Sequence, residues 1–169
     1  TGRPGAPNGG SGFDGSSFLD VLLGKKNSHH EFVFGAHTTR GIINGSMSYP
    51  IRSVRSRSLK FIQNLSHESA FTNVNTRNGG GGVWQSWIDS DGSTHVRAQF
   101  YTNRPAEELY DLAKDPYELH NVITEPAYAA QVEELRNQLT DWMKQQNDRG
   151  AETEALAGQR KNPGGKPRK

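Results

Sequence analysis

The sequence predicts an α+β domain in which a small antiparallel sheet of three or four strands is covered by one C-terminal amphipathic helix. Two observations predict it. Residues 49–55 and 59–65 show the two-residue alternation of strands, and apolar residues after position 126 recur at the spacing of a helix. A helix with an apolar stripe must bury that stripe, and the preceding strands offer the surface for it.

Four segments are the candidate strands. Glu31–Ala36 is rich in aromatic and β-branched residues, which favours a strand. Tyr49–Arg55 and Leu59–Leu65 flank a short polar turn and therefore predict an antiparallel hairpin. Glu108–Leu112 is the fourth candidate, and the Lys114–Pro116 turn follows it.

The clearest predicted element is a helix from about Pro126 to Gln146. Thr124 and Glu125 supply polar residues for its N-terminal cap, and Pro126 suits the first helical turn. Five apolar residues recur three or four positions apart and so share one face. They are Tyr128, Val132, Leu135, Leu139 and Trp142.

The remaining chain divides by composition. Residues 1–12 are rich in Gly and Pro and predict a flexible segment, residues 13–148 form the predicted folded domain, and residues 149–169 predict a disordered basic tail. Within the domain, residues 16–23 predict one or two helical turns. Residues 66–104 show no clear period, and the part after Asp91–Gly92 could be helical or irregular.

Composition limits the possible functions. Only 32% of the 169 residues are hydrophobic and the mean hydropathy is −0.82, so much of the length must be loop or tail. Without its five basic and two acidic residues from position 150 onward, the chain keeps 15 basic and 16 acidic residues. The positive charge therefore lies in the tail, which argues against a folded nucleic-acid-binding module.

Other classes are excluded by what the sequence lacks. The chain has no Cys, which excludes disulfides, cysteine zinc sites and thiol nucleophiles. No apolar run approaches the roughly 20 residues that span a bilayer. The first residue is Thr1, inside a Gly/Pro-rich stretch, which is typical of a fragment boundary.

Three segments in order carry a family resemblance. They are DGSSFLDVLLGKK at 14–26, FGAHTTRGIINGSMSYPIRSVRSRSLKFIQNL at 34–65, and RPAEELYDLAKDPYELHNV at 104–122. Together they resemble the C-terminal region of type I, formylglycine-dependent sulfatases. The HTTRGIING and YPIRSVR parts are most similar to the N-sulphoglucosamine sulphohydrolase (heparan N-sulfatase)-like group.

The resemblance implies that this chain lacks the catalytic half of its parent enzyme. In that family an alkaline-phosphatase-like N-terminal domain carries a formylglycine, made from Cys or Ser in C/S-x-P-x-R, and a calcium ion held by Asp and Asn side chains. The C-terminal subdomain has a four-stranded antiparallel sheet with a helix packed on it, and it completes the substrate pocket. Calcium and formylglycine are therefore expected in the missing N-terminal domain, with none bound by this chain.

The resemblance also implies partners, a location and an activity. The partners are the N-terminal sulfatase domain of the same polypeptide and a sulfated carbohydrate, with no nucleic acid and no membrane span. The family is exported to a periplasm or to the outside of the cell. The parent would hydrolyse sulfate esters or sulfamates of a glycosaminoglycan, and this chain alone is expected to be inactive.

One segment formally fits the formylglycine motif. Ser48–Arg52 reads S-Y-P-I-R, but the motif prefers small residues where Tyr49 and Ile51 stand, and the segment is predicted to be a strand. We therefore reject Ser48 as the nucleophile.

Three residues are candidates for substrate binding. His37 and Arg40 follow the first strand, and in the family context they could contact an anionic sugar through charge-assisted hydrogen bonds. The alternative is a loop histidine and a solvated arginine. Arg52 shares a strand face with Val54, so it needs a partner. That partner is a sulfate or carboxylate of the substrate or, with more weight, an internal Asp or Glu.

Two further functions stay open. A free-standing accessory module could hold an anionic polysaccharide through its arginines and basic tail without turnover. More weakly, the tail could bind nucleic acid. No candidate metal site emerges, because the histidines lack ligand spacing and Asp89–Gly92 lacks the later ligands of a calcium loop.

Overall fold

The computed structural model describes residues 17–38, 49–73, 75–76 and 82–157. The chain divides into two compact units, residues 1–31 and residues 32–169. In the first unit, helix α1 (Leu19–Leu22) is a single turn, and Gly24 at φ +68° ends it. The helical turn predicted within residues 16–23 is confirmed.

The second unit contains a four-stranded sheet with every neighbouring pair antiparallel. Its strands are β1 (Val33–His37), β2 (Ile51–Arg55), β3 (Leu59–Asn64) and β4 (Glu107–Asp111), in the spatial order β1-β2-β3-β4. The predicted β2–β3 hairpin is confirmed. Its turn closes when the Ser56 amide donates to the Leu59 carbonyl at 2.9 Å.

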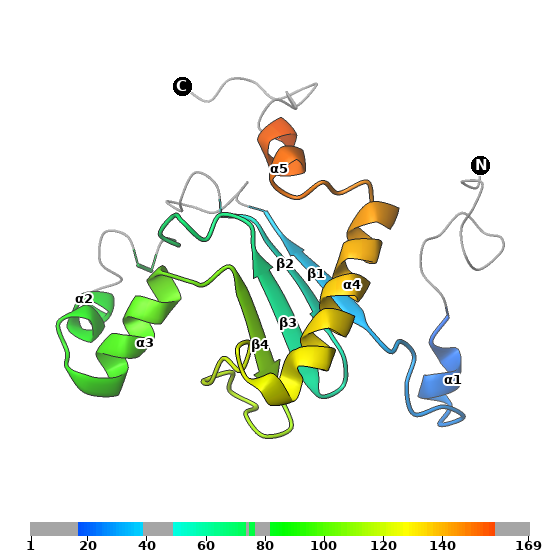
Figure 1. The fold of residues 1–169 in the computed structure, drawn as a ribbon. Helices are drawn as coiled ribbons and strands as arrows, with labels where there is room; N and C mark the ends of the chain where they lie inside the picture. The colour runs from blue at the N-terminus through cyan, green and yellow to red at the C-terminus, as the bar shows by residue number, and fades with distance from the viewer. Residues whose placement is uncertain (1–16, 39–48, 74, 77–81, 158–169) are drawn as a thin grey trace. The chain divides into compact units, whose positions relative to one another are not determined.

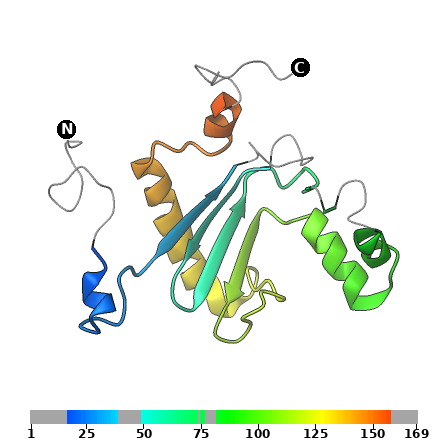
Figure 2. The same ribbon diagram turned by 180° about the vertical axis from the view of Figure 1, so that it is seen from behind.

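Helix α4 (Ala129–Gln145) covers one face of this sheet, as Figures 1 and 2 show from opposite sides. A short 3-10 turn, η1 (Pro126–Tyr128), leads into it. The register of the strands aligns one apolar residue from each into a row across the sheet, and three residues of the helix pack on that row. The strand residues are Phe34, Val54, Phe61 and Leu109, and the helix residues are Val132, Leu135 and Leu139.

The predicted N-terminal cap of this helix does not form. No side chain caps either η1 or α4. The Tyr128 hydroxyl instead donates to Asp111 and accepts from Lys114, both at 2.8 Å. The start of the helix is therefore held to the end of β4 rather than by a local cap.

Between β3 and β4 the chain forms two packed helices, α2 (Val83–Ile88) and α3 (Gly92–Thr102). The segment after Asp91 is thus a helix. Gly92 lies at φ +66°, so a side chain there would be strained. The C-terminal end of α3 is held where Thr102 O accepts the Phe71 amide at 2.8 Å.

The disorder predicted from residue 149 is wrong for residues 151–157, which form helix α5 (Ala151–Ala157). The physical reason is a long-range ion pair from Glu154 of this helix to Arg52, at 2.7 Å. The Arg149 amide also donates to Thr153 Oγ1 at 2.7 Å at the start of the helix. The predicted disorder of 1–12 and of 158–169 concerns residues outside those described. Among the described residues, no helix is long and apolar enough to cross a membrane.

Truncating the centre of the helix–sheet core should cost much of the stability. Leu135 is 2% exposed, and we expect Leu135→Ala to lower the free energy of unfolding by about 2–5 kcal/mol, because it removes buried methyl groups and leaves a cavity. Urea unfolding followed by circular dichroism measures this. The control Leu119→Ala, at a side chain 52% exposed, should change stability by less than about 0.5 kcal/mol. Equal effects of the two changes would contradict the packing described here.

Candidate functional site

The sheet face opposite α4 carries a buried polar cluster. Side chains alternate along a strand, so Glu108 and Tyr110 of β4 point away from the helix that Leu109 contacts. Glu108 lies opposite Ile62 and Tyr110 opposite Lys60 on the neighbouring strand β3. This placement brings charged groups together on a face where water is largely excluded.

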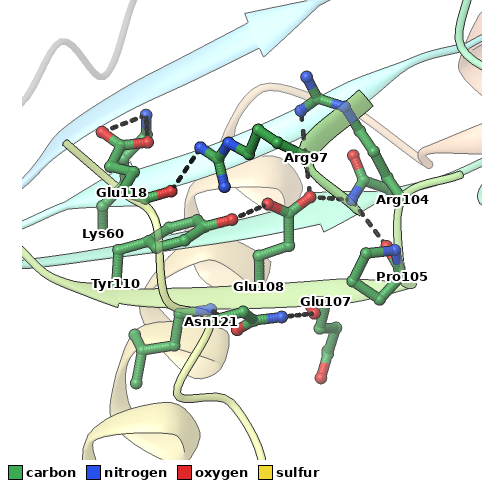
Figure 3. A network of polar contacts seen from close by, with 11 residues as sticks. Lys60, Arg97, Arg104, Pro105, Glu107, Glu108, Tyr110, Glu118 and Asn121 are labelled. Atoms are coloured by element: carbon green, nitrogen blue, oxygen red, sulfur yellow. Dashed lines mark hydrogen bonds and ion pairs between the residues drawn. The ribbon is translucent and has the colours of Figure 1, made fainter. Parts of the chain in front are cut away.

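Glu108 is the centre of the cluster, and its side chain is 2% exposed. Its carboxylate accepts from the Tyr110 hydroxyl at 2.5 Å and from Asn64 Nδ2 at 2.7 Å, while Arg104 lies 4.0 Å away (Figure 3). Burial, followed by the hydrogen bond to Glu108, raises the pKa of Tyr110 far above its usual value. The hydroxyl therefore remains a proton donor, and the carboxylate is held in one position.

Arg104 joins this cluster to an aromatic group. Its guanidinium lies 5.0 Å from the ring centroid of Phe71 and 5.2 Å from that of Tyr101. The rings of His37 and Tyr49 also contact Phe71, at centroid distances of 6.2 and 5.1 Å. Phe71 is thus the common neighbour of residues from β1, from the segment just before β2 and from the end of α3.

Several buried polar atoms around Phe71 have no hydrogen-bond partner in the described part of the chain. They are His37 Nε2, Tyr49 Oη, Asn64 Oδ1 and Arg104 Nε. Burial raises the pKa of Tyr49, although Arg104 partly opposes this. An unpaired buried polar group costs about 1–3 kcal/mol, so this face combines fixed charge with unused hydrogen-bonding capacity.

Of the predicted site residues, His37 lies on this face, at the end of β1. His37 ends β1, is partly buried, and accepts Arg52 Nη1 on its carbonyl at 3.1 Å. Arg40 lies outside the described residues. The structure brings the His37 ring to Phe71, and the roles of His37 and Arg40 in substrate binding stay predictions.

Arg52 has internal acidic partners, which was the favoured of the two predictions for this residue. The side chain is 2% exposed, its Nε donates to Asp148 at 2.5 Å, and its Nη2 donates to Glu154 at 2.7 Å. The remaining N–H groups reach the carbonyls of His37 and Ile51 and the second oxygen of Asp148. All five donors are therefore engaged within the chain, which leaves none for a substrate anion.

The ion cluster also shifts the proton affinities of its members. Burial disfavours the charged guanidinium, but the hydrogen bonds to Asp148 and Glu154 outweigh it, and the pKa of Arg52 is raised. Burial likewise disfavours the charged carboxylate of Asp148, but Arg52 outweighs it, and the pKa of Asp148 is lowered. Both charges are thus stabilised in the folded chain.

The formylglycine motif does not fit its formal match in this chain. Within Ser48–Arg52, Tyr49 and Pro50 are buried, and Ile51 and Arg52 begin strand β2. The guanidinium of Arg52 is paired with Asp148. Ser48 lies outside the described residues. The described residues contain no group of three His, Asp or Glu side chains that could hold a metal ion.

Comparison with known proteins now gives the class. Residues 93–145, which run from α3 through β4 into α4, match the family model for the N-sulphoglucosamine sulphohydrolase C-terminal region. An ulvan-active sulfatase of Formosa agariphila is 34% identical over 135 residues, covering 80% of this chain and 25% of that protein. The N-sulphoglucosamine sulphohydrolase of Homo sapiens is 29% identical over 121 residues, covering 69% and 23%.

The chain therefore carries the C-terminal region of a sulfatase. Within the sulfatases, its similarity is to the N-sulphoglucosamine sulphohydrolase C-terminal group, as the motifs at 34–65 indicated. A solved 2-O GAG sulfatase is 21% identical and covers 79% of this chain and 20% of its own, with a TM-score of 0.48. The chain spans about a quarter of the length of the curated relatives that it matches.

Sequence reasoning missed the Glu108 cluster, although a signal was present. Glu108 and Tyr110 alternate with the core residue Leu109 in a strand predicted to be buried. A carboxylate at such a position needs hydrogen-bond partners. The neighbouring Glu107, which faces the other way, is bound by Arg136 of α4 at 2.6 Å.

The Arg52 cluster predicts a dependence of stability on pH. Because the pKa of Asp148 is lowered on folding, its contribution is complete above the ordinary Asp value of about 3.9 and is lost as the pH falls through the folded-state value. Asp148→Asn should cost at most about 3 kcal/mol at pH 7, near the lower end for breaking a buried pair, because Glu154 remains. The difference from the unmodified chain should shrink below about pH 4.

Urea unfolding at pH 7 and at pH 3 measures this difference. The matched control is Asp141→Asn, whose partner Lys144 is 71% exposed, and it should cost less than about 0.5 kcal/mol at either pH. A cost for Asp148→Asn that stays constant with pH would contradict the proposed ion pair.

Proposed function

We propose that this chain is the C-terminal part of a sulfatase that hydrolyses sulfate esters or sulfamates of a sulfated carbohydrate, with a glycosaminoglycan as the preferred class. In this proposal the chain completes the fold of the enzyme and shapes one side of the substrate pocket. The observation that carries the proposal is the 34% identity to an ulvan-active sulfatase over 135 residues, which is 80% of this chain.

The catalytic groups belong, in this proposal, to an N-terminal domain of the same polypeptide. The chain has no Cys, the last two residues of its only formal formylglycine motif lie in β2, and its described residues hold no metal cluster. Formylglycine and calcium are therefore assigned to that domain. The chain by itself is proposed to be inactive towards sulfate esters and sulfamates.

The pocket side of the chain is proposed to be the end of the sheet where β1 stops and β2 begins. These strands are neighbours and antiparallel, so a two-residue turn could join them, yet residues 38–50 connect them. Long connections between paired strands are commonly functional. His37 borders this connection and Arg40 lies within it, which supports their proposed contact with an anionic sugar.

A second candidate function is an accessory module that binds anionic polysaccharide without turnover. One observation favours it. The last ten residues contain five basic and no acidic side chains. Clustered Lys and Arg bind polyanions through electrostatic attraction, which salt weakens.

The sulfatase proposal predicts how the activity divides. Sulfate release from a sulfated disaccharide should be seen with the parent polypeptide and should be absent with the 169-residue chain alone. Arg40→Gln in the parent should lower kcat/KM by about ten- to a hundred-fold, the loss of one charge-assisted hydrogen bond. The control Arg57→Gln, at an exposed position in the β2–β3 turn, should leave kcat/KM unchanged. Turnover by the chain alone would overturn the proposal.

The accessory-module proposal predicts a role for the tail. Removal of residues 158–169, which leaves α5 and its ion pair intact, should weaken binding to heparin–agarose and lower the salt concentration needed for elution. A chain ending at Ala157 that elutes at the same salt concentration as the full chain would eliminate this function for the tail.

A further inference from the structure

A pocket of about 440 Å³ lies beside the α2–α3 helix pair. Three aromatic rings line it, and polar atoms come from the segment before α2 and from the middle of α3. The principal lining residues are Trp84, Trp87, Tyr101, Asn75 and Arg97. Tyr101 also packs on Phe71 of the aromatic group beside Glu108, but none of the five is a predicted substrate residue.

The aromatic rings pack against one another and remain partly exposed to solvent. Trp84 packs edge-on against Tyr101 at 5.4 Å between ring centroids, and Trp87 lies 6.1 Å from Trp84 at an angle of 43°. Trp87 is 45% exposed. An exposed indole backed by a second fixed ring offers a flat apolar surface at low entropic cost.

Arg97 supplies positive charge at the same pocket. Its Nη2 donates to the Glu118 carbonyl at 2.8 Å and its Nη1 reaches the Leu119 carbonyl at 3.4 Å, so backbone atoms hold the guanidinium (Figure 3). Within the described part of the chain, Arg97 makes no ion pair with a carboxylate. The guanidinium also lies 5.7 Å from the Phe100 ring centroid, so its charge is fixed in place without a direct carboxylate partner among the described residues, an arrangement that can bind an anion.

Asn75 adds a neutral donor and acceptor. Its side chain is exposed, and its backbone amide is already bound by Asn73 Oδ1 at 2.9 Å, which fixes the turn that presents it. A carboxamide can pair with two adjacent hydroxyl groups. The pocket thus combines an aromatic surface, a fixed cation and an amide.

We propose that this pocket binds one ring of an anionic carbohydrate, with the ring face on Trp87, the carboxylate or sulfate on Arg97 and hydroxyl groups on Asn75. The ligand class rests on the proposed function, whereas this binding position is separate from the His37 and Arg40 contacts proposed there. A lining dominated by aromatic rings with a fixed cation is complementary to a charged sugar, whereas a protein-docking surface would need no cation at this point.

Fluorescence titration of the full 169-residue chain tests the proposal. The third tryptophan, Trp142, stacks on Phe34 in the core, so a Trp142→Phe background leaves only the two pocket indoles to report. The probe is a heparin-derived disaccharide that carries sulfate and uronate groups, compared with its desulfated, carboxyl-reduced form. We expect quenching and a blue shift by the charged disaccharide, with at least tenfold weaker binding of the neutral form.

Variants separate the parts of the site. Trp87→Ala should abolish binding, and Arg97→Gln should remove the preference for the charged disaccharide, which Arg97→Lys should partly restore. The charge-matched control Arg57→Gln should bind as the unmodified chain does, and circular dichroism verifies that each variant is folded. Equal affinity for both disaccharides, or unchanged preference in Arg97→Gln, would overturn the proposal.

A second measurement distinguishes a protein interface from a sugar site. If acrylamide quenches Trp87 in the chain but not in the parent polypeptide, another domain covers the pocket and the proposal fails. Sulfate release by the parent is recorded separately. Turnover without binding at this pocket therefore rejects the pocket alone, whereas absence of turnover rejects the proposed function.

Discussion

The packing of Leu135 and Leu139 of α4 against Phe61 and Leu109 of the sheet determines where the other described parts of residues 32–169 can lie. These side chains are almost fully buried and belong to one core. Because side chains in a strand alternate, this packing commits Glu108, Tyr110 and Lys60 to the opposite face. The polar chemistry of that face is thus a consequence of the helix on the other.

The two faces differ in what their charges do. On the α4 face, Arg52 is saturated by Asp148 and Glu154, so its charge ties the C-terminal segment to β2. On the opposite face, Arg104 is held over aromatic rings beside Glu108, and Arg97 is held by backbone carbonyls and lies over the Phe100 ring. The charge of Arg52 thus serves the structure on the first face, and we propose that the charge of Arg97 serves recognition on the second.

The sheet and α4 could be predicted because their apolar residues are periodic, and periodicity is a local property. Helix α5 could not, because its ion pair joins Glu154 to a residue 102 positions away and its composition alone resembles a disordered tail. Helix α3 was left open because it buries only Ala98 and so has no apolar stripe. The alternation of side chains along the strand showed that Arg52 needs a charged partner, but it could not identify Asp148 and Glu154. His37 and Arg40 became candidates mainly through the family resemblance.

Amide hydrogen exchange on the 169-residue chain tests most directly whether the helix and the sheet form one cooperative unit. The account predicts that the amides of β2, β3, β4 and α4 exchange slowest and with one common free energy of opening, while those of α2, α3 and α5 exchange faster. Exchange from α4 that is faster than from the strands, and independent of them, would show that the helix does not complete the sheet and would contradict the account.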